Sequence, residues 1–401
     1  MDEFQTACVE RVGQLRTAFT QLYESIGADP DSPQDVARKL RVNKTLAWNV
    51  ARLLQAADEL AAVSHVPGAG SLEKVIKATV EHGADAAAVD RAREAVRDFH
   101  SMIRSYAGDR GTLDLIIDGT GSDDNGRLEL SRKLAFRGNS GLYGVQARTR
   151  VVTHVLAPNP EKPDRLDLVM IGGYVGFRRL RPAVKWPIFM RRAWGSDNDA
   201  VIKSSLEPIE PSEQASLGFP VIGSMTRGNV PPINPVQSPE GRNFVLSDGP
   251  VGNEGAFDCF WGDILRAAVN RFADDDDSTG EFGAIVTAPA ETLVMDIIAD
   301  RDLDFALQPD VLVFGHIFAH GRPTGGRDDP SLLPITQPVR TLTGSPPLVN
   351  TTAIPNYPKL MATVYQRMGW DPSRLRGVRL VLEYPPLASN VILRFKLPPR
   401  P

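Results

Sequence analysis

The hydrophobic pattern of the chain changes near residue 113 from a helical period to a strand-like one. Before this point, apolar residues recur every three or four positions, which predicts helices. Beyond it, after one more helix near 128–136, segments rich in Val, Leu, Ile and Tyr predict strands. Helices first and strands later favour an α+β fold. The expected helices cover 2–26, 71–82 and 86–107, and the expected strands cover 145–157 and 166–177.

Residues 32–54 predict two short helices joined by a tight turn. Ser32 is the expected N-cap, with Pro33 at the first helical position. Asn43 is the expected cap of a second helix that runs to about Ala62. Val36, Ala37, Leu40, Val42, Leu46, Val50, Leu53 and Leu54 form the expected buried side, and the outward side carries Lys44, Thr45, Ala47, Trp48 and Asn49.

This segment resembles the helix-turn-helix that bacterial transcriptional regulators use to bind DNA. The resemblance implies that the start of the second helix enters the major groove, where Asn49 would pair with adenine and Thr45 or Ala47 would contact a thymine methyl. The implied DNA-binding residues are Arg38, Lys39, Arg41, Lys44, Thr45, Trp48, Asn49 and Arg52. Five cations against Asp35 alone give the segment a net charge of +4. The alternative is a helical hairpin that only packs or dimerises.

Arg41 departs from the resemblance, because many such regulators have glycine in the turn. A non-glycine residue with positive φ costs roughly 1 kcal/mol. We therefore expect a more open turn.

Four regions follow from these patterns. Residues 1–65 are expected to be helical and to contain the helix-turn-helix, and 66–112 to form a helical connector. Residues 113–255 read as a β-rich basic region with a long irregular excursion. Residues 256–401 read as an α+β region.

An internal duplication is suggested within 256–401. At a constant offset of 96, segments 260–298 and 356–394 share a predicted order of amphipathic helix, polar turn, strand, proline and strand. Pro289 matches Pro385, and antiparallel pairs are expected around both. The alternative is coincidence between two ordinary units.

A basic segment covers residues 127–192, with fourteen cations against four acids. Its densest part carries Arg178, Arg179, Arg181, Lys185, Arg191 and Arg192 among aromatic residues. Such a pattern suits nucleic-acid contact. It equally suits contact with an acidic surface of a second copy, such as Asp274–Asp277, or a plain solvated face.

Few residues point to catalysis or to a cofactor. Cys8 and Cys259 exclude a disulfide framework and a cysteine-only zinc site, and both are expected to be buried. His316 and His320 lack a helical frame for metal, and Gly119–Gly126 lacks the acids of a calcium loop. No metal or cofactor is therefore predicted. Asp296, Asp300, Asp302 and Asp304 form an alternating acidic run that would suit a magnesium-dependent nuclease.

The sequence favours a binding protein over an enzyme. We predict a cytoplasmic DNA-binding regulator that acts as a homo-oligomer, with residues 113–401 as a sensing or assembly region. The N-terminus carries Asp2 and Glu3 in place of the basic patch and apolar run of a secretory signal, and no stretch approaches the ~20 apolar residues of a membrane span, so neither secretion nor a membrane partner is predicted. The alternatives are a self-assembling scaffold that uses the helix-turn-helix as an adaptor, and the nuclease.

Overall fold

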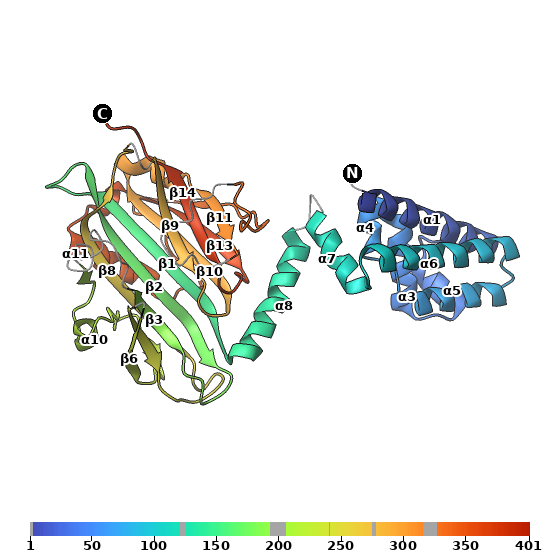
Figure 1. Cartoon of the computed structure of the whole chain (residues 1–401), viewed down its shortest axis with the longest axis horizontal. Helices are drawn as coiled ribbons and strands as arrows, with labels where there is room; N and C mark the ends of the chain where they lie inside the picture. The colour runs from blue at the N-terminus through green and yellow to red at the C-terminus, as the bar shows by residue number, and fades with distance from the viewer. Residues whose placement is uncertain (1–2, 121–124, 193–205, 240, 275–277, 316–326) are drawn as a thin grey trace. The chain divides into compact units, whose positions relative to one another are not determined.

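The structure is a computed structural model that describes residues 3–120, 125–192, 206–239, 241–274, 278–315 and 327–401. Two compact units divide the chain, a helical unit (Met1–Asp124) and a sheet unit (Asn125–Pro401). The fold class is α+β, as predicted (Figure 1). Among the described residues, no helix is apolar over a length that would cross a bilayer.

The helical unit is built around α1 and α6, which pack along each other (Figure 1). Val12, Leu15 and Phe19 of α1 are fully buried with Phe99 of α6. Residues 66–112 supply α5 and α6 to the same core as residues 1–65. The helices are α1 (Glu3–Ser25), α2 (Pro33–Leu40), α3 (Lys44–Gln55), α4 (Glu59–Val63), α5 (Ala69–Glu81), α6 (Ala86–Tyr106) and α7 (Arg110–Thr120).

The expected single helix from Lys44 to Ala62 is wrong, because α3 ends at Gln55. Arg16 of α1 donates to the carbonyls of Leu54 and Ala56, at 3.1 and 2.9 Å, which satisfies acceptors at the helix end. Asp58 then begins a new helix by accepting a hydrogen bond from the Ala61 amide at 2.8 Å. These two polar contacts separate α3 from α4.

The turn between α2 and α3 is tight, and the expected opening does not occur. Arg41 adopts the left-handed conformation, with φ of 51° and ψ of 36°, so an arginine occupies a conformation that favours glycine. Ser32 stands at the N-cap, but its hydroxyl donates to Asp29 at 3.0 Å and caps no helix amide.

Helical structure continues beyond residue 113, which corrects the expected change of pattern. Leu113 and Ile117 are buried one turn apart in α7. Helix α8 (Asn125–Tyr143) is the first element of the sheet unit. Residues 121–124 of the predicted polar turn Gly119–Gly126 lie outside the described residues.

The large sheet of the sheet unit has the order β12-β13-β10-β1-β2-β8-β4, with β5 also paired to β8. Among the described strands of this sheet, β1 and β10 run parallel and the other pairs are antiparallel. Its strands are β1 (Val145–Pro158), β2 (Arg165–Arg179), β4 (Glu207–Pro208), β5 (Arg227–Gly228), β8 (Phe257–Asn270), β10 (Ala290–Asp300), β12 (Arg340–Leu342) and β13 (Leu375–Glu383). The expected strands 145–157 and 166–177 are confirmed as β1 and β2.

Both faces of the large sheet are covered, which explains why its central strands are continuously apolar. Val151 and Val155 of β1 face helix α11 (Tyr357–Met368), whereas Val152 and Leu156 face a small sheet. The small sheet has the order β11-β14-β9, from β9 (Thr279–Ile285), β11 (Asp310–Phe314) and β14 (Asn390–Lys396). A third sheet contains β3 (Pro187–Arg192), β6 (Ile233–Ser238) and β7 (Gly241–Leu246). The remaining elements are α10 (Glu213–Ser216), η1 (Arg301–Leu307) and η2 (Pro372–Arg374).

The two strand-proline-strand segments exist, but neither is a hairpin. Strand β9 pairs with β14, and β10 pairs with β13, so each segment pairs crosswise with the other. Hydrogen bonds from Val286 to Ser389 and from Tyr384 to Glu291 carry the pairing across the bends at Pro289 and Pro385. The helix expected at the start of the first segment is also wrong, because residues 257–270 form β8. Its aromatic and branched residues are buried on both sides, which suits a central strand.

Candidate functional site

The start of α3 presents the predicted DNA-binding side chains on an accessible surface. Lys44, Thr45 and Trp48 are exposed, Trp48 by 45%, and Asn49 is half-buried. The Asn43 side chain accepts a hydrogen bond from the Thr45 amide at 2.8 Å, which fixes the first turn of the helix. Ala47 points inward instead and is 2% exposed, so its predicted base contact is wrong.

The cations of this segment differ in their availability. Arg41, Lys44 and Arg52 are exposed and make no ion pair within the described part of the chain. Arg38 pairs with Asp35 at 3.1 Å, but both are exposed, so this pair is weak. Lys39 donates to the carbonyls of Ile26 and Gly27 beyond the end of α1, so part of its capacity is used within the protein.

A groove of about 730 Å³ lies between the start of α3 and helix α5. Thr45 and Asn49 line one side, and Ser71, Lys74 and Lys77 line the other. The two lysines are exposed and unpaired among the described residues. They were missed from the sequence, although two lysines three positions apart on one face of a helix were a readable signal.

The basic segment does not form one open cationic face, because two of its arginines are used internally. Arg179 is 1% exposed and donates to the carbonyls of Val184 and Ser247. Arg191 donates to the Gly218 carbonyl at 2.8 Å and pairs with Asp263 at 2.9 Å. For the buried Arg179, the predicted nucleic-acid or subunit contact is wrong, whereas Arg191 is partly exposed and its predicted contact stays a prediction.

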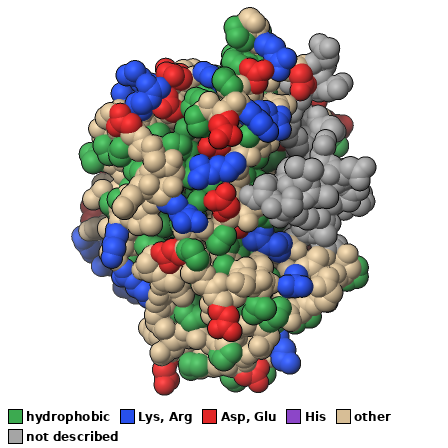
Figure 2. All heavy atoms as spheres, turned by 90° about the vertical axis from the view of Figure 1, so that its left-hand side faces the viewer, with side chains coloured by type: hydrophobic (Ala, Val, Ile, Leu, Met, Phe, Trp, Pro, Cys, Tyr) green, Lys and Arg blue, Asp and Glu red, His purple; other side chains and the backbone are tan. Residues whose placement is uncertain are grey.

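The other members of this group are scattered over the surface. Arg178 bonds Asn253 at 3.1 Å, and exposed Arg181 bonds the Leu142 carbonyl at 2.8 Å. Lys185 is exposed, and the side chain of Arg192 lies outside the described residues, as do Asp275–Asp277. On the face shown in Figure 2, blue and red side chains are interspersed and no broad patch of one sign forms.

Asp296, Asp300 and Asp302 of the acidic run are paired with arginines. Asp296 is fully buried and accepts two hydrogen bonds from Arg379, at 2.8 and 2.7 Å, and one from the Tyr357 hydroxyl at 2.8 Å. Asp300 accepts two bonds from Arg374, at 2.8 and 2.7 Å. Carboxylates committed to guanidinium groups are poor ligands for magnesium. This arrangement argues against the nuclease reading.

No cluster of three or more metal-ligating side chains occurs within the described residues. His316 and His320 lie outside them. Cys8 and Cys259 are fully buried, as predicted. Burial raises the pKa of Cys8 to about 11 and that of Cys259 to about 12, so neither thiol is activated as a nucleophile.

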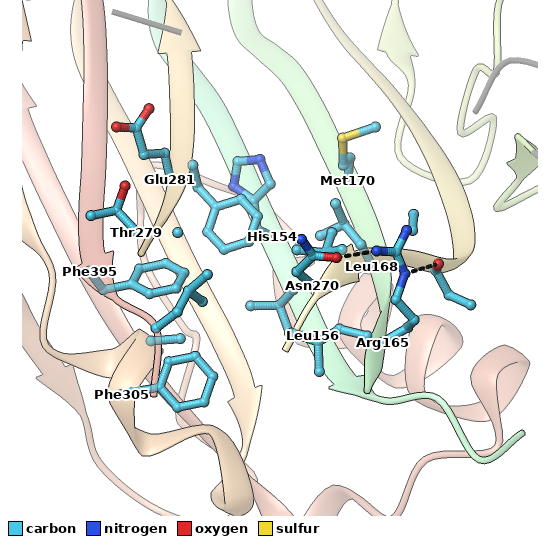
Figure 3. A pocket seen from close by; sticks show the side chains of 18 of the residues that line it. His154, Leu156, Arg165, Leu168, Met170, Asn270, Thr279, Glu281, Phe305 and Phe395 are labelled. Carbon is cyan, nitrogen blue, oxygen red and sulfur yellow. Dashed lines mark hydrogen bonds between the residues drawn. The ribbon is translucent and has the colours of Figure 1, made fainter. Parts of the chain in front are cut away.

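Two neighbouring cavities lie between the large sheet and β9. One has a volume of about 880 Å³ and the other about 480 Å³, and His154, Met170 and Gly283 line both. Volumes of roughly 300–1,000 Å³ are typical of small-molecule sites. Figure 3 shows the larger cavity, with Phe305 and Phe395 on one side and Leu156 and Leu168 on the other.

Strand register explains how the smaller cavity is built. Arg150 of β1 lies opposite Tyr174 of β2, and His154 lies opposite Met170, which in turn pairs with Asp263 of β8. These positions alternate with residues that face α11, so they share the opposite face of the sheet. A polar set is thereby placed on a face that is otherwise apolar.

Arg150 places a positive charge beside this cavity and against two aromatic rings. Its guanidinium lies over the rings of Tyr174 and Trp261, at 5.1 and 5.2 Å from the two ring centroids. Burial lowers the pKa of Arg150. The His154 ring stacks on Phe282 with 4.4 Å between centroids, and burial, followed by the Arg150 charge, lowers the pKa of His154 to about 3. His154 is therefore neutral near pH 7.

Comparisons with known proteins give no family for this chain. No family model matches it, and no curated protein matches it. Among solved structures, a putative protease from Parabacteroides distasonis aligns with 64% of this chain and 41% of its own, at 7% identity and a TM-score of 0.28. An M1 zinc metallopeptidase from Deinococcus radiodurans aligns with 63% of this chain and 42% of its own, at 8% identity and a TM-score of 0.22. The chain thus spans less than half of either structure, and likenesses this weak support no inference about fold or activity.

Proposed function

We propose that the protein binds duplex DNA through α2, α3 and α5, and that it acts as a transcriptional regulator. The observation that carries this proposal is a set of exposed cations on and beside α3 that have no ion-pair partner among the described residues. Arg41 and the half-buried Asn49 line the groove together with Lys74 and Lys77. Lys44 begins α3 and Arg52 lies in its last turn, and both are exposed. Cations suit the phosphates, and an amide at the start of a helix suits a base edge.

The exposure of Trp48 also supports this assignment. Trp48 is 45% exposed on an otherwise polar helix face, so its ring is available for contact with a partner. At a nucleic-acid surface, its ring would pack against sugar or base edges. The sheet unit would then serve sensing or assembly.

Duplex binding is tested by fluorescence anisotropy on the full chain, with a randomised duplex and a salt series. Lys44→Ala should weaken binding about tenfold on every sequence and lower the salt slope by about 1, because one phosphate contact is lost. Asn49→Ala should instead change which oligonucleotides are selected. Arg97→Ala, at an exposed position of α6, is the matched control and should change neither the affinity for duplex DNA nor the oligonucleotides that are selected. A wild-type protein without duplex affinity at low salt would rule out the proposal.

We also propose that the chain self-associates through α8. Leu130 and Leu134, one turn apart, are exposed by 57% and 58%, and Leu142 by 70%. Exposed leucines grouped on one helix are typical of an interaction surface. A symmetric dimer would present two copies of α3 to DNA.

Sedimentation velocity tests this association. The wild-type chain should remain a dimer at high salt, because an apolar contact is not screened. Replacing both Leu130 and Leu134 with glutamate should give a monomer. Leu348→Glu, exposed by 63% elsewhere, is the control and should leave the dimer intact. A dimer that dissociates only at high salt would point to charged surfaces, and a wild-type monomer would contradict the proposal.

A further inference from the structure

Arg150 is a cation without a counter-ion inside the sheet unit. Within the described residues, no carboxylate lies within ion-pair distance of it. Its Nη1 donates to the carbonyls of Val151 and Gly173, at 2.6 and 3.1 Å. Its Nε is buried and has no hydrogen-bond partner in the described part of the chain. A buried charge or polar atom without a partner costs free energy, so a fold keeps one only where something else is gained.

The neighbouring acid does not neutralise Arg150. Asp263 lines the same cavity, but its carboxylate is paired with Arg191 at 2.9 Å. The second unpartnered polar atom at this place is Nδ1 of His154, which is also buried. Arg150 and His154, which each carry one buried nitrogen without a partner among the described residues, therefore both line one cavity of about 480 Å³.

The position of Arg150 is fixed by its surroundings. A Cβ at Gly172 would lie 2.5 Å from Nε1 of Trp261, so only glycine allows the indole to lie across β2. The guanidinium of Arg150 then rests on this indole and on the ring of Tyr174. An arginine held over two aromatic rings is preorganised to bind a planar or tetrahedral anion.

The larger cavity adjoins the smaller one, and its wall contains both apolar and polar side chains. It shares His154, Met170 and Gly283 with the smaller one, and apolar side chains form much of its wall (Figure 3). Its polar groups already have partners: Arg165 bonds Ala267 and Asn270, and Glu281 pairs with Arg394. Among the described residues that line the two cavities, the buried polar atoms that lack hydrogen-bond partners are therefore those of Arg150 and His154, beside the smaller cavity.

We propose that the sheet unit binds a small amphiphilic anion, with its acidic head group on Arg150 and its apolar body in the larger cavity. The His154 imidazole lies between the two parts of the site and accepts or donates a further hydrogen bond. This proposal does not depend on DNA binding, since it concerns a site within the sheet unit and is tested by direct binding.

The ligand class is tested by calorimetric titration of the full chain with four probes. Decanoate and decyl phosphate share the apolar chain and differ in the acid, so their comparison separates a carboxylate from a phosphate ligand. We expect at least one of them to bind tenfold or more tightly than butyrate, which lacks the chain, and than decyltrimethylammonium, which has the opposite charge. Failure of both anions to bind at millimolar concentration, or equal binding of the cation, would overturn the proposal.

The role of Arg150 is tested by Arg150→Met, which removes the charge and keeps an apolar side chain of similar length. Without ligand, this variant should melt at a higher temperature than wild type, and it should lose at least tenfold in affinity for the anion. Arg340→Met, at an exposed position of β12, is the control and should change neither quantity. Unchanged affinity, or a lower melting temperature that marks Arg150 as structural support, would contradict the assignment.

Discussion

Replacing Arg379 with methionine should remove about 3 to 5 kcal/mol from the unfolding free energy of the sheet unit. Arg379 supplies two of the three hydrogen bonds to the fully buried Asp296 carboxylate, and the third comes from Tyr357. Without the guanidinium, a negative charge stays in the core between the large sheet and α11. The charge must then be tolerated or neutralised, and both cost free energy.

Urea denaturation measures this loss, and two further variants interpret it. Arg340→Met removes the exposed arginine that lies opposite Arg379 in strand register, and it should cost less than about 0.5 kcal/mol. The double variant Asp296→Leu with Arg379→Met should recover much of the loss, because apolar pairs often replace buried ion pairs without penalty. A loss below about 1 kcal/mol for Arg379→Met alone would show that Asp296 is not held by this contact.

Acidification from pH 7 to pH 4.5 should destabilise the wild-type sheet unit by about 2 to 3 kcal/mol more than it destabilises His154→Phe. The pKa of His154 is lowered to about 3 in the folded protein, from 6.5 in an exposed histidine. Below pH 6.5 the unfolded chain therefore binds a proton that the folded chain excludes. Stability falls as the pH drops from 6.5 towards 3 and levels off below that.

The comparison requires denaturation curves at both pH values. Phe282→Leu is the matched control, because it removes the ring stacked on His154 and keeps the titrating group. It should lower stability at both pH values while retaining the wild-type dependence on pH. If His154→Phe follows the wild-type pH dependence, the imidazole is not excluded from protonation in the folded state.

Local features were predicted from the sequence where a period or a cap specified them. A repeat of three to four residues is enough to specify a helix, as in α1, α5 and α6, and an apolar run is enough to specify a strand, as in β1 and β2. The prediction that Lys44, Thr45, Trp48 and Asn49 lie on one accessible surface also holds, because a strong stripe of buried residues fixes the orientation of α3.

Features that depend on distant partners could not be read in this way. Arg179 and Arg191 resemble surface cations until the carbonyls and the carboxylate that bind them are known. The cavity was missed because Arg150 and His154 look unremarkable in sequence. Their spacing of four, in a predicted strand, places both on one face, and two polar residues on the face of an apolar strand were the available signal.

The crosswise pairing of the two strand-proline-strand segments has a consequence for synthesis of the protein. Residues 279–285 must wait for 390–396, and residues 290–300 must wait for 375–383, before either ladder can close. During synthesis, all residues of the helical unit's core leave the ribosome early, so this unit can fold first. The sheet unit cannot complete its sheets until nearly all of its chain has been translated. During that interval the apolar strands are unprotected, and chaperone engagement should be concentrated there.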